Sequence, residues 1–337
     1  MFDLLIKSLS NEPNDIDRKN IVFCEEKVSL MIERMIASNL SGSFNTEVYS
    51  FGNFLRAKKN FDNLLTKEGS AMVVKSVLSN VKLTCFKASK QSIAPTIYDL
   101  IIQLKSAKIT PDDIKCATDK TEGILKNKLL DTYTIFTEYE KFVAENGFED
   151  QSSVLSYLPE IILNDDELSN ANVYLVGFSG FTAQTKSAIN ALLQKSNNIT
   201  AILCEGDNLL AFVNETASYI KNLAKENGCP FIYNRKPSNY NAKAKAIMEN
   251  LFYPFAKKMD TNELSTNANV YYSPISNKIS EVERVAEIIK NLVITGDCRY
   301  KDITIAIPDQ TYSGYISSVF NTLGIPISPR GASSSGS

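Results

Sequence analysis

The sequence predicts an α/β fold in which helices flank a parallel sheet, with a helical insertion and the start of a second α/β unit. Strands pass directly into amphipathic helices, a long stretch has helical periodicity without strand signals, and strand–helix alternation then returns. Such alternation is typical of parallel sheets, whose strands need a crossover connection. The length of 337 residues suffices for more than one folding unit.

Two strand–helix units are predicted near the N-terminus. The run "IVFC" at Ile21–Cys24 is β-branched and apolar, and "TEVYSFGNFLRAKKNF" repeats the plan with a strand at Val48–Phe51. A basic, partly aromatic helix is expected after the second strand. Apolar side chains at helical spacing follow the first strand: Val28, Met31, Ile32 and Met35.

A helical insertion is predicted between about Thr66 and Glu160, where strand signals vanish. One helix is marked by an apolar stripe with steps of three and four residues: Leu125, Leu129, Tyr133, Phe136, Tyr139 and Val143. Strands then resume with "NVYLVGF" and "ITAILCE", and Thr182 is placed to cap the helix between them.

A second α/β unit is expected to open at "NVYYSPISNKISEVERVAEIIKNL", where Ser280 and Glu283 suggest a capping box. "KDITIAIP" is then predicted to be a buried strand and "YSGYISSVFNTLG" a helix. The expected domains are 1–65 with 161–265 as the sheet domain, 66–160 as the insertion, and 266–328 as the start of the second unit. Residues 329–337, rich in Ser and Gly, are interpreted as an expression scar or a cut linker.

The composition excludes several classes of function. The chain has no histidine, so Ser-His-Asp and Cys-His triads and His-ligated metals are excluded. Its six cysteines form no CxxC pair, which favours buried thiols over zinc sites or disulfides. No apolar run approaches the roughly 18 residues of a membrane span and no secretion signal is recognisable, so a cytoplasmic protein without membrane partners is expected.

Charge is distributed unevenly along the chain. Residues 51–90 contain eight basic and two acidic side chains, whereas 131–170 contain ten acidic ones and Lys141 alone. Each block is interpreted either as a solvated face or, for the basic block, as a surface that binds anions.

Neither ATP hydrolysis nor metal chemistry is predicted. A phosphate-binding loop of the form GxxxxGK[ST] is absent, and "KSLSNEPNDIDRKN" before the first strand contains no glycine. The pairs Glu25–Glu26 and Asp165–Asp166 are interpreted as solvated surface, and Gly177 with Gly180 does not match GxGxxG. No catalytic, cofactor-binding or metal-binding residue is therefore assigned.

Aromatic and basic side chains gather where strands are predicted to end. Ligands of open α/β sheets lie beyond the carboxyl ends of strands, and single-stranded nucleic acid is bound by stacking rings and cations. The alternative is that the rings belong to the core, and for Phe51 and Phe178 the two interpretations weigh equally. The side chains are Tyr49, Phe51 and Phe54 beside Arg56, Lys58 and Lys59, and Phe178 and Phe181 after a later strand.

In their order, the segments "IVFCEEKVSL", "EVYSFGNFL", "VYLVGFSGFTAQ" and "RYKDITIAIPD" resemble the N-terminal helicase-like part of the AddB (RexB) family, over roughly Asn20 to Ile327. The resemblance implies a RecA-like domain of an inactivated UvrD-type helicase. It further implies membership of a bacterial helicase-nuclease that resects double-strand breaks with the motor protein AddA (RexA), where ATP and Mg²⁺ are used. The family's 5'-3' exonuclease domain and iron-sulfur cluster would lie beyond this chain, which is expected to have no activity of its own.

The resemblance also implies how DNA would be held. Rings would stack bases, Ser29 and Asn53 would hydrogen-bond base edges, and Lys27 and Arg56 would contact phosphates or bases. Single-stranded DNA and duplex ends are the expected ligands, and the strand would be inspected for the hotspot sequence Chi. Because Lys27, Asn53 and Arg56 replace other residue types of familiar members, a different hotspot sequence, or none, is expected for this chain. The alternative is a scaffold that docks AddA without binding DNA. The resemblance assigns Lys27, Ser29, Phe51, Asn53, Arg56, and Phe178 or Phe181, while Lys58 and Lys59 complete the basic cluster.

Overall fold

The computed structural model describes residues 2–11, 18–40, 44–86, 92–150, 152–206, 213–235 and 273–328. The chain divides into two compact units, Met1–Lys236 and Pro237–Ser337. The expected domain boundary at residues 265 and 266 and the expected tail at 329–337 lie outside the described residues, so both remain predictions.

A four-stranded parallel sheet forms the centre of the first unit, with strand order β2-β1-β5-β6. Strands β1 and β5 are buried along their whole length, as expected for central strands covered on both faces. The predicted α/β class with a parallel sheet is thereby confirmed. The strands are β1 (Asn20–Cys24), β2 (Thr46–Tyr49), β5 (Asn172–Val176) and β6 (Asn198–Ile202).

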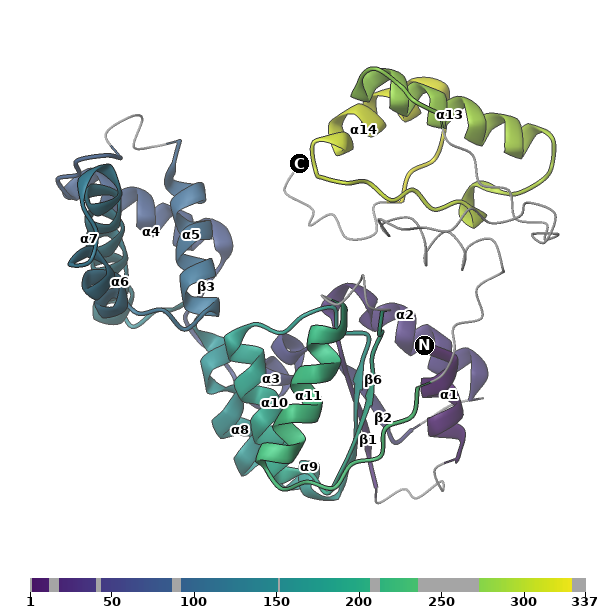
Figure 1. The fold of residues 1–337 in the computed structure, drawn as a ribbon, viewed down its shortest axis with the longest axis horizontal. Coiled ribbons are helices and arrows are strands. Elements are labelled where there is room, and N and C mark those ends of the chain that lie inside the picture. Colours follow the sequence, from purple (N-terminus) through teal and green to yellow (C-terminus); the bar gives the residue numbers. More distant parts are fainter. Residues whose placement is uncertain are drawn as a thin grey trace, which may run out of the picture. The chain divides into compact units, whose positions relative to one another are not determined.

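Helices cover both faces of this sheet (Figure 1). Ile21 and Phe23 of β1 face one core and Val22 and Cys24 face the other, because successive side chains of a strand point to opposite sides. The first core includes α3 (Phe51–Lys58), η1 (Val154–Tyr157), α8 (Leu158–Asn164), α10 (Ala183–Lys195) and α11 (Glu215–Glu226). The second includes α1 (Phe2–Asn11) and α2 (Glu26–Asn39), while the short α9 (Asp166–Asn170) precedes β5.

Between β3 and β4, in the region where the sequence predicts an insertion, the described residues form four α-helices. The chain enters through β3 (Leu64–Leu65) and returns through β4 (Glu149–Asp150), which pair in parallel as a two-stranded neck. Of the predicted apolar stripe, the last three members are buried in the helical core and Leu125 is exposed. The helices are α4 (Lys67–Asn80), α5 (Ala94–Ser106), α6 (Pro111–Thr118) and α7 (Gly123–Glu145).

The second unit contains α13 (Lys278–Ile294), the short η4 (Tyr300–Asp302) and α14 (Tyr312–Leu323). The Asn277 side chain, not that of Ser280, caps α13 by accepting a hydrogen bond from the Ser280 N–H. The strand predicted at "KDITIAIP" is also wrong: no strand forms there, and Ile305 and Ile307 are 38% and 36% exposed. A strand needs a hydrogen-bonded neighbour, and residues 273–328 contain no other strand.

None of the six cysteines forms a disulfide. Cys24 is buried, but Cys116 and Cys204 are exposed, so the expectation of buried thiols is wrong for these two. Within the described ranges, no group of three or more His, Cys, Asp or Glu could hold a metal ion. No helix in those ranges is long and apolar enough to cross a bilayer.

Candidate nucleic-acid interface

The turns that follow β1, β2 and β5 lie at one edge of the sheet. Register pairs Cys24 with Val176 across β1 and β5, and Phe23 with Tyr49 across β1 and β2. Because all strands run in the same direction, their carboxyl ends meet at this edge, which is where ligands of open α/β sheets bind. The sequence candidates Lys27, Phe51 and Phe178 all come from these three turns.

One carboxylate fills the turn after β1. The strand passes into α2 through the single residue Glu25, whose Oε1 accepts hydrogen bonds from Ser179 N at 3.0 Å and Ser179 Oγ at 2.6 Å. Lys27 Nζ lies 3.3 Å from the other carboxylate oxygen. Partial burial alone would raise the pKa of Glu25, but the Ser179 hydrogen bonds and the Lys27 ammonium outweigh burial and hold it below its ordinary value.

Sequence reasoning missed this role, since it placed Glu25 with Glu26 on a solvated surface. The available indication was an acidic residue directly after one buried strand and a Gly-Phe-Ser-Gly turn after another. Parallel neighbours place such turns side by side, but strand order is needed to know that β1 and β5 are neighbours. The turn after β5 therefore donates its hydrogen bonds to a carboxylate that the turn after β1 supplies.

The turn after β5 is shaped by glycine and by a helix cap. Gly177 has φ 71°, a left-handed conformation that favours glycine, and its N–H donates to Ile202 O of β6 at 3.0 Å. Thr182 Oγ1 accepts a hydrogen bond from Thr185 N at 3.2 Å and caps α10, as predicted. Ser179 and Gly180 are exposed between these fixed ends.

The rings of Phe51 and Phe178 belong to the core. They are 5% and 7% exposed, and their ring centroids lie 5.7 Å apart, with Phe23 4.9 Å from Phe51. The base-stacking role expected of these two rings is therefore corrected, because neither has a free face; the core alternative is the one that the structure bears out. Phe51 is the first residue of α3 and packs at the end of the sheet, where burial of its apolar ring stabilises the fold and leaves the ring inaccessible to a base.

Phe181 differs from the other two rings. It is half-buried, and its centroid lies 5.2 Å from Phe178 and 5.9 Å from Tyr219 of α11. The four rings from Phe51 through Phe178 and Phe181 to Tyr219 thus form a continuous series that starts in the core and reaches a helix on the outer face.

Polar candidates at the same edge keep contact with solvent. The Lys27 side chain is 66% exposed, and Arg56 is exposed and donates to Asn53 Oδ1 at 3.2 Å. Ser50 caps α3 by accepting from Asn53 N, which leaves the Asn53 side chain to Arg56. The Ser29 hydroxyl is bonded to Glu26 O at 2.8 Å, so it is satisfied within its own helix.

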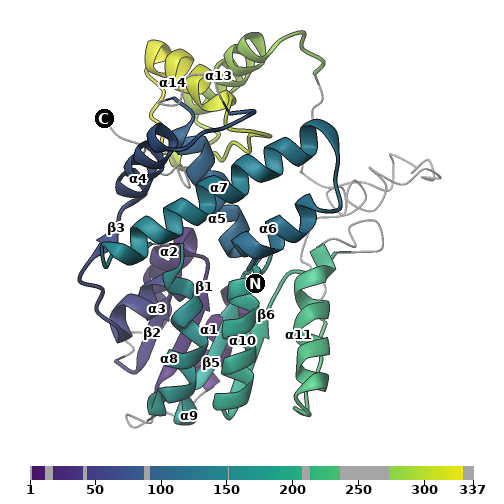
Figure 2. The same ribbon diagram turned by 90° about the vertical axis from the view of Figure 1, so that its left-hand side faces the viewer.

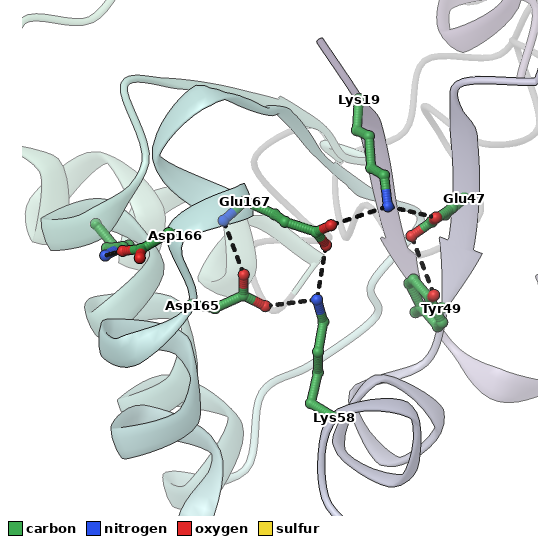
Figure 3. Close-up of polar contacts among 8 residues, drawn as sticks. Lys19, Glu47, Tyr49, Lys58, Asp165, Asp166 and Glu167 are labelled. Carbon is green, nitrogen blue, oxygen red and sulfur yellow. Dashed lines mark hydrogen bonds and ion pairs between the residues drawn. The ribbon is translucent and has the colours of Figure 1, made fainter. Parts of the chain in front are cut away.

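Lys58 and Lys59 lie away from this edge. Helix α3 runs back from the carboxyl edge, so Lys58 at its final residue reaches the segment before β5, whereas Arg56, two residues earlier, turns back to Asn53 of the first turn. There Lys58 Nζ lies 2.8 Å from both Asp165 and Glu167, which precede β5 (Figure 3). Lys59 Nζ lies 3.9 Å from the centroid of the Tyr157 ring. The structure therefore does not bring these two lysines together with Lys27, because acidic and aromatic partners hold them elsewhere.

Lys58 is part of an ion-pair network that ties four segments together. Glu167 also binds Lys19 at 3.2 Å, and Lys19 binds Glu47 of β2 at 3.0 Å (Figure 3). Partial burial alone would lower the pKa of Lys58, but its hydrogen bonds to Asp165 and Glu167 outweigh burial and raise it. Part of the acidic block of the sequence thus neutralises part of the basic block.

Comparison with known proteins identifies the family of this chain. A family model described as "ADDB, N-terminal" matches residues 4–251. The chain is 27% identical to the B-type subunit of an ATP-dependent helicase/deoxyribonuclease from Clostridium botulinum strain Hall, over 95% of this chain and 30% of that protein. Proteins of the same description from Clostridium tetani and Acetivibrio thermocellus are 27% and 24% identical over 92% and 91% of this chain, and 29% of each relative.

This chain spans about 30% of the length of these relatives. The family model covers well over half of the chain, including the whole sheet and the helices that flank it. The chain therefore belongs to the AddB N-terminal family.

Proposed function

We propose that this chain forms a helicase-shaped module that binds single-stranded DNA without hydrolysing ATP. It acts within a helicase-deoxyribonuclease that processes broken DNA ends, where a motor protein of the AddA type supplies ATP-driven movement and any nuclease or iron-sulfur chemistry lies outside this chain. The relatives are described as one subunit of an ATP-dependent helicase/deoxyribonuclease, and this description supports the partner and the pathway.

The Glu25 carboxylate in the turn after β1 is the observation that carries the non-hydrolysing role. A phosphate-binding loop needs several backbone N–H groups that converge on the anion and a lysine that neutralises it. Here the turn is one residue long, and its carboxylate already accepts the Ser179 N–H and hydroxyl. A phosphate about 4 Å from this carboxylate would be repelled by roughly 1–4 kcal/mol per unit charge in partly hydrated surroundings.

DNA binding is supported by the side chains that remain solvent-facing at the same edge. Lys27 and Arg56 are exposed cations suited to phosphates, Asn53 carries an amide suited to base edges, and the half-buried Phe181 supplies a ring. Whether the strand is read for a hotspot such as Chi is a finer part of the same proposal. Duplex ends would be contacted as the strand emerges from the motor protein.

A scaffold that docks the motor protein without touching DNA is the second candidate. The burial of Phe51 and Phe178 favours it, because two of the three rings expected to stack bases are committed to the core. In that case the polar edge would contact protein, and the affinity of the isolated chain for DNA would be negligible.

Titration of the full chain with a fluorescent oligothymidylate of about 20 nucleotides, at several salt concentrations, distinguishes the candidates. We expect salt-dependent binding that a Lys27→Ala/Arg56→Ala variant weakens about tenfold, with the slope of log affinity against log salt reduced by about 1.4. Lys75→Ala, which removes an exposed cation of α4, is the matched control. Absence of salt-dependent binding would favour the scaffold, and measurable ATP turnover by the purified chain would contradict the non-hydrolysing role.

A further inference from the structure

A groove of about 480 Å³ lies on the outer side of α10, between α8 and α11. Figure 2 shows these three helices side by side. Helix α10 contributes Lys186, Asn190 and Gln194, which are four residues apart and share one face of the helix. Tyr219 of α11 and Lys108 from the turn after α5 add further polar side chains to the lining. The groove is separate from the three strand-end turns, which contribute none of its lining residues.

Lys108 is held in a backbone conformation that glycine normally adopts. Its φ is 59°, and no other non-glycine residue in the described ranges has a positive φ. It occupies the position after a helix end where the next N–H, that of Ile109, donates back to Leu104 O at 2.9 Å. The equivalent turn after α7, α11, α13 and α14 is made in each case by a glycine: Gly147, Gly228, Gly296 and Gly324.

A glycine would make this turn without strain, so the lysine contributes only through its side chain. That side chain crosses to α10, where Lys108 Nζ donates to Ser187 Oγ at 2.5 Å. The strained residue therefore delivers a cation to the rim of the groove. Non-glycine residues held in such strained backbone conformations cluster at functional sites.

Both cations of the groove lack a carboxylate partner within ion-pair distance in the described part of the chain. Lys186 Nζ instead lies 5.0 Å from the centroid of the Tyr219 ring, whose hydroxyl donates to Lys186 O. Seven other lysines in the described part of the same unit do have carboxylate partners: Lys19, Lys27, Lys58, Lys67, Lys105, Lys195 and Lys221. The groove is thus a place where positive charge stays available.

Amide groups line the floor beside these cations. Asn190 Oδ1 accepts a hydrogen bond from Asn227 Nδ2 at 2.9 Å, which leaves the Asn190 amide nitrogen as a donor. Gln194 adds a second amide one turn further along α10. Lysine, serine, asparagine and glutamine side chains are the groups that commonly contact phosphate and sugar oxygens of nucleic acids. A single acidic residue, Glu226, lines the groove.

We propose that this groove binds the sugar-phosphate backbone of a nucleic-acid strand, with Lys108 and Lys186 at phosphates and the α10 amides at neighbouring oxygens. The proposal rests on the proposed function and adds a second contact surface to it. The ring series from Phe178 through Phe181 to Tyr219 joins the turn after β5 to the groove, so a strand bound at one surface can continue along the other. A nucleic acid is favoured over an acidic peptide because Tyr219 lies beside Lys186 and offers a ring for stacking.

Lys108→Gly provides a test in which folding and binding are expected to change in opposite directions. Release of the left-handed strain should raise the thermal unfolding midpoint of the full chain, while loss of the cation should weaken oligothymidylate binding about three- to tenfold. The salt slope should fall by about 0.7, the value for one phosphate contact on a single strand. Lys186→Ala should lower the affinity and slope by similar amounts. Lys126→Ala, which removes an exposed cation of α7 outside the groove, should change neither.

Unchanged affinity and slope in both groove variants would overturn the groove assignment. The strand-end variant Lys27→Ala/Arg56→Ala, titrated in parallel, tests the proposed function separately, because either surface can lose its effect while the other keeps it. A complete lack of oligothymidylate binding by the unmodified chain would overturn both. A labelled polyglutamate that binds equally tightly, with the same dependence on Lys108 and Lys186, would overturn the choice of nucleic acid over an acidic peptide.

Discussion

Glu25 and Ser179 connect two turns that lie 154 residues apart in the sequence, with the serine N–H and hydroxyl both donating to one carboxylate oxygen. A similar arrangement occurs in the helical insertion, where Asp131 accepts the N–H groups of Thr84, Cys85 and Phe86 at 2.6–3.1 Å. In both places the fold uses its own carboxylate to satisfy backbone donors that could otherwise hold an external anion. The strand-end turn thus satisfies the Ser179 donors with a carboxylate of the same fold.

Replacement of Glu25 by Gln should destabilise the protein by about 1–2 kcal/mol at pH 7, because a charge-assisted hydrogen bond becomes a neutral one. The pKa of Glu25 is lower in the folded state than in the unfolded state. Its contribution to the free energy of unfolding is therefore fully present above the unfolded-state pKa of about 4.3, and it is lost as pH falls through the lower folded-state pKa. Urea unfolding at pH 7 and at about pH 3 should show a gap between the two proteins that narrows in acid. Glu26→Gln, at the exposed neighbour, is the control, and an equal gap at both pH values would rule out the ionic contribution.

Lys58→Ala should lower the stability of the protein, whereas Arg56→Ala should weaken DNA binding. Loss of Lys58 leaves the buried Asp165 carboxylate uncompensated, so we expect a destabilisation of about 1–2 kcal/mol, below the 3–5 kcal/mol of a fully buried pair because Lys58 keeps contact with water. Loss of Arg56 should leave stability nearly unchanged and weaken DNA binding. Denaturant unfolding and oligothymidylate titration of both variants provide the measurement. A larger DNA-binding defect in the Lys58 variant would place the interface at the amino edge instead.

Several parts of the fold follow from local pattern. The strands at Asn20–Cys24 and Asn172–Val176 are apolar runs bounded by polar residues, and Thr182 caps the next helix where the sequence predicts it. The strand predicted at "KDITIAIP" had an equally apolar pattern, yet Ile305 and Ile307 are exposed. An apolar pattern shows that a segment has side chains suited to burial. A strand also requires a neighbouring strand for its backbone hydrogen bonds, and the local sequence does not specify that neighbour.

The candidate site was only partly predictable for the same reason. Lys27 and Arg56 are predictable because they follow predicted strands, but the pattern around Phe51 suits a stacking ring and a core ring equally well. Lys58 was grouped with Arg56 by sequence, although its partners Asp165 and Glu167 lie more than 100 residues away. Such long-range pairs need the order of strands and the direction of each helix before they can be assigned.

A buried ion pair holds the neck of the helical insertion. Lys105 Nζ of α5 lies 2.8 Å from Asp150 Oδ2, and the Tyr98 hydroxyl donates to Asp150 Oδ1 at 2.7 Å. Lys105→Met should destabilise the protein by about 3–5 kcal/mol, because Asp150 is then a buried charge without a counter-charge. Adding Asp150→Asn should recover part of that loss. Unfolding free energies of the two single variants and the double variant form the required cycle.

The pH dependence of this pair provides an independent check. Burial alone would raise the pKa of Asp150, but the Lys105 ammonium and the Ser152 hydrogen bonds outweigh burial and lower it. The contribution of the Lys105–Asp150 pair to the free energy of unfolding is therefore present at neutral pH, and it is lost as pH falls through the lowered folded-state pKa of Asp150. Strictly additive effects of Lys105→Met and Asp150→Asn at pH 7 would show that the two side chains do not stabilise each other.

Thiol reactivity should separate Cys24 from the exposed cysteines. Burial, with a smaller effect from the Glu33 and Glu25 carboxylates, raises the pKa of Cys24 to about 12. At pH 8 only about one Cys24 side chain in ten thousand is therefore a thiolate, and the fold shields it from reagent. An aromatic disulfide reagent should react promptly with Cys116 and Cys204 and reach Cys24 only at the rate of unfolding. Cys24→Ser should remove amplitude from the slow phase alone; loss of fast amplitude would mean that the end of β1 opens to solvent in the native state.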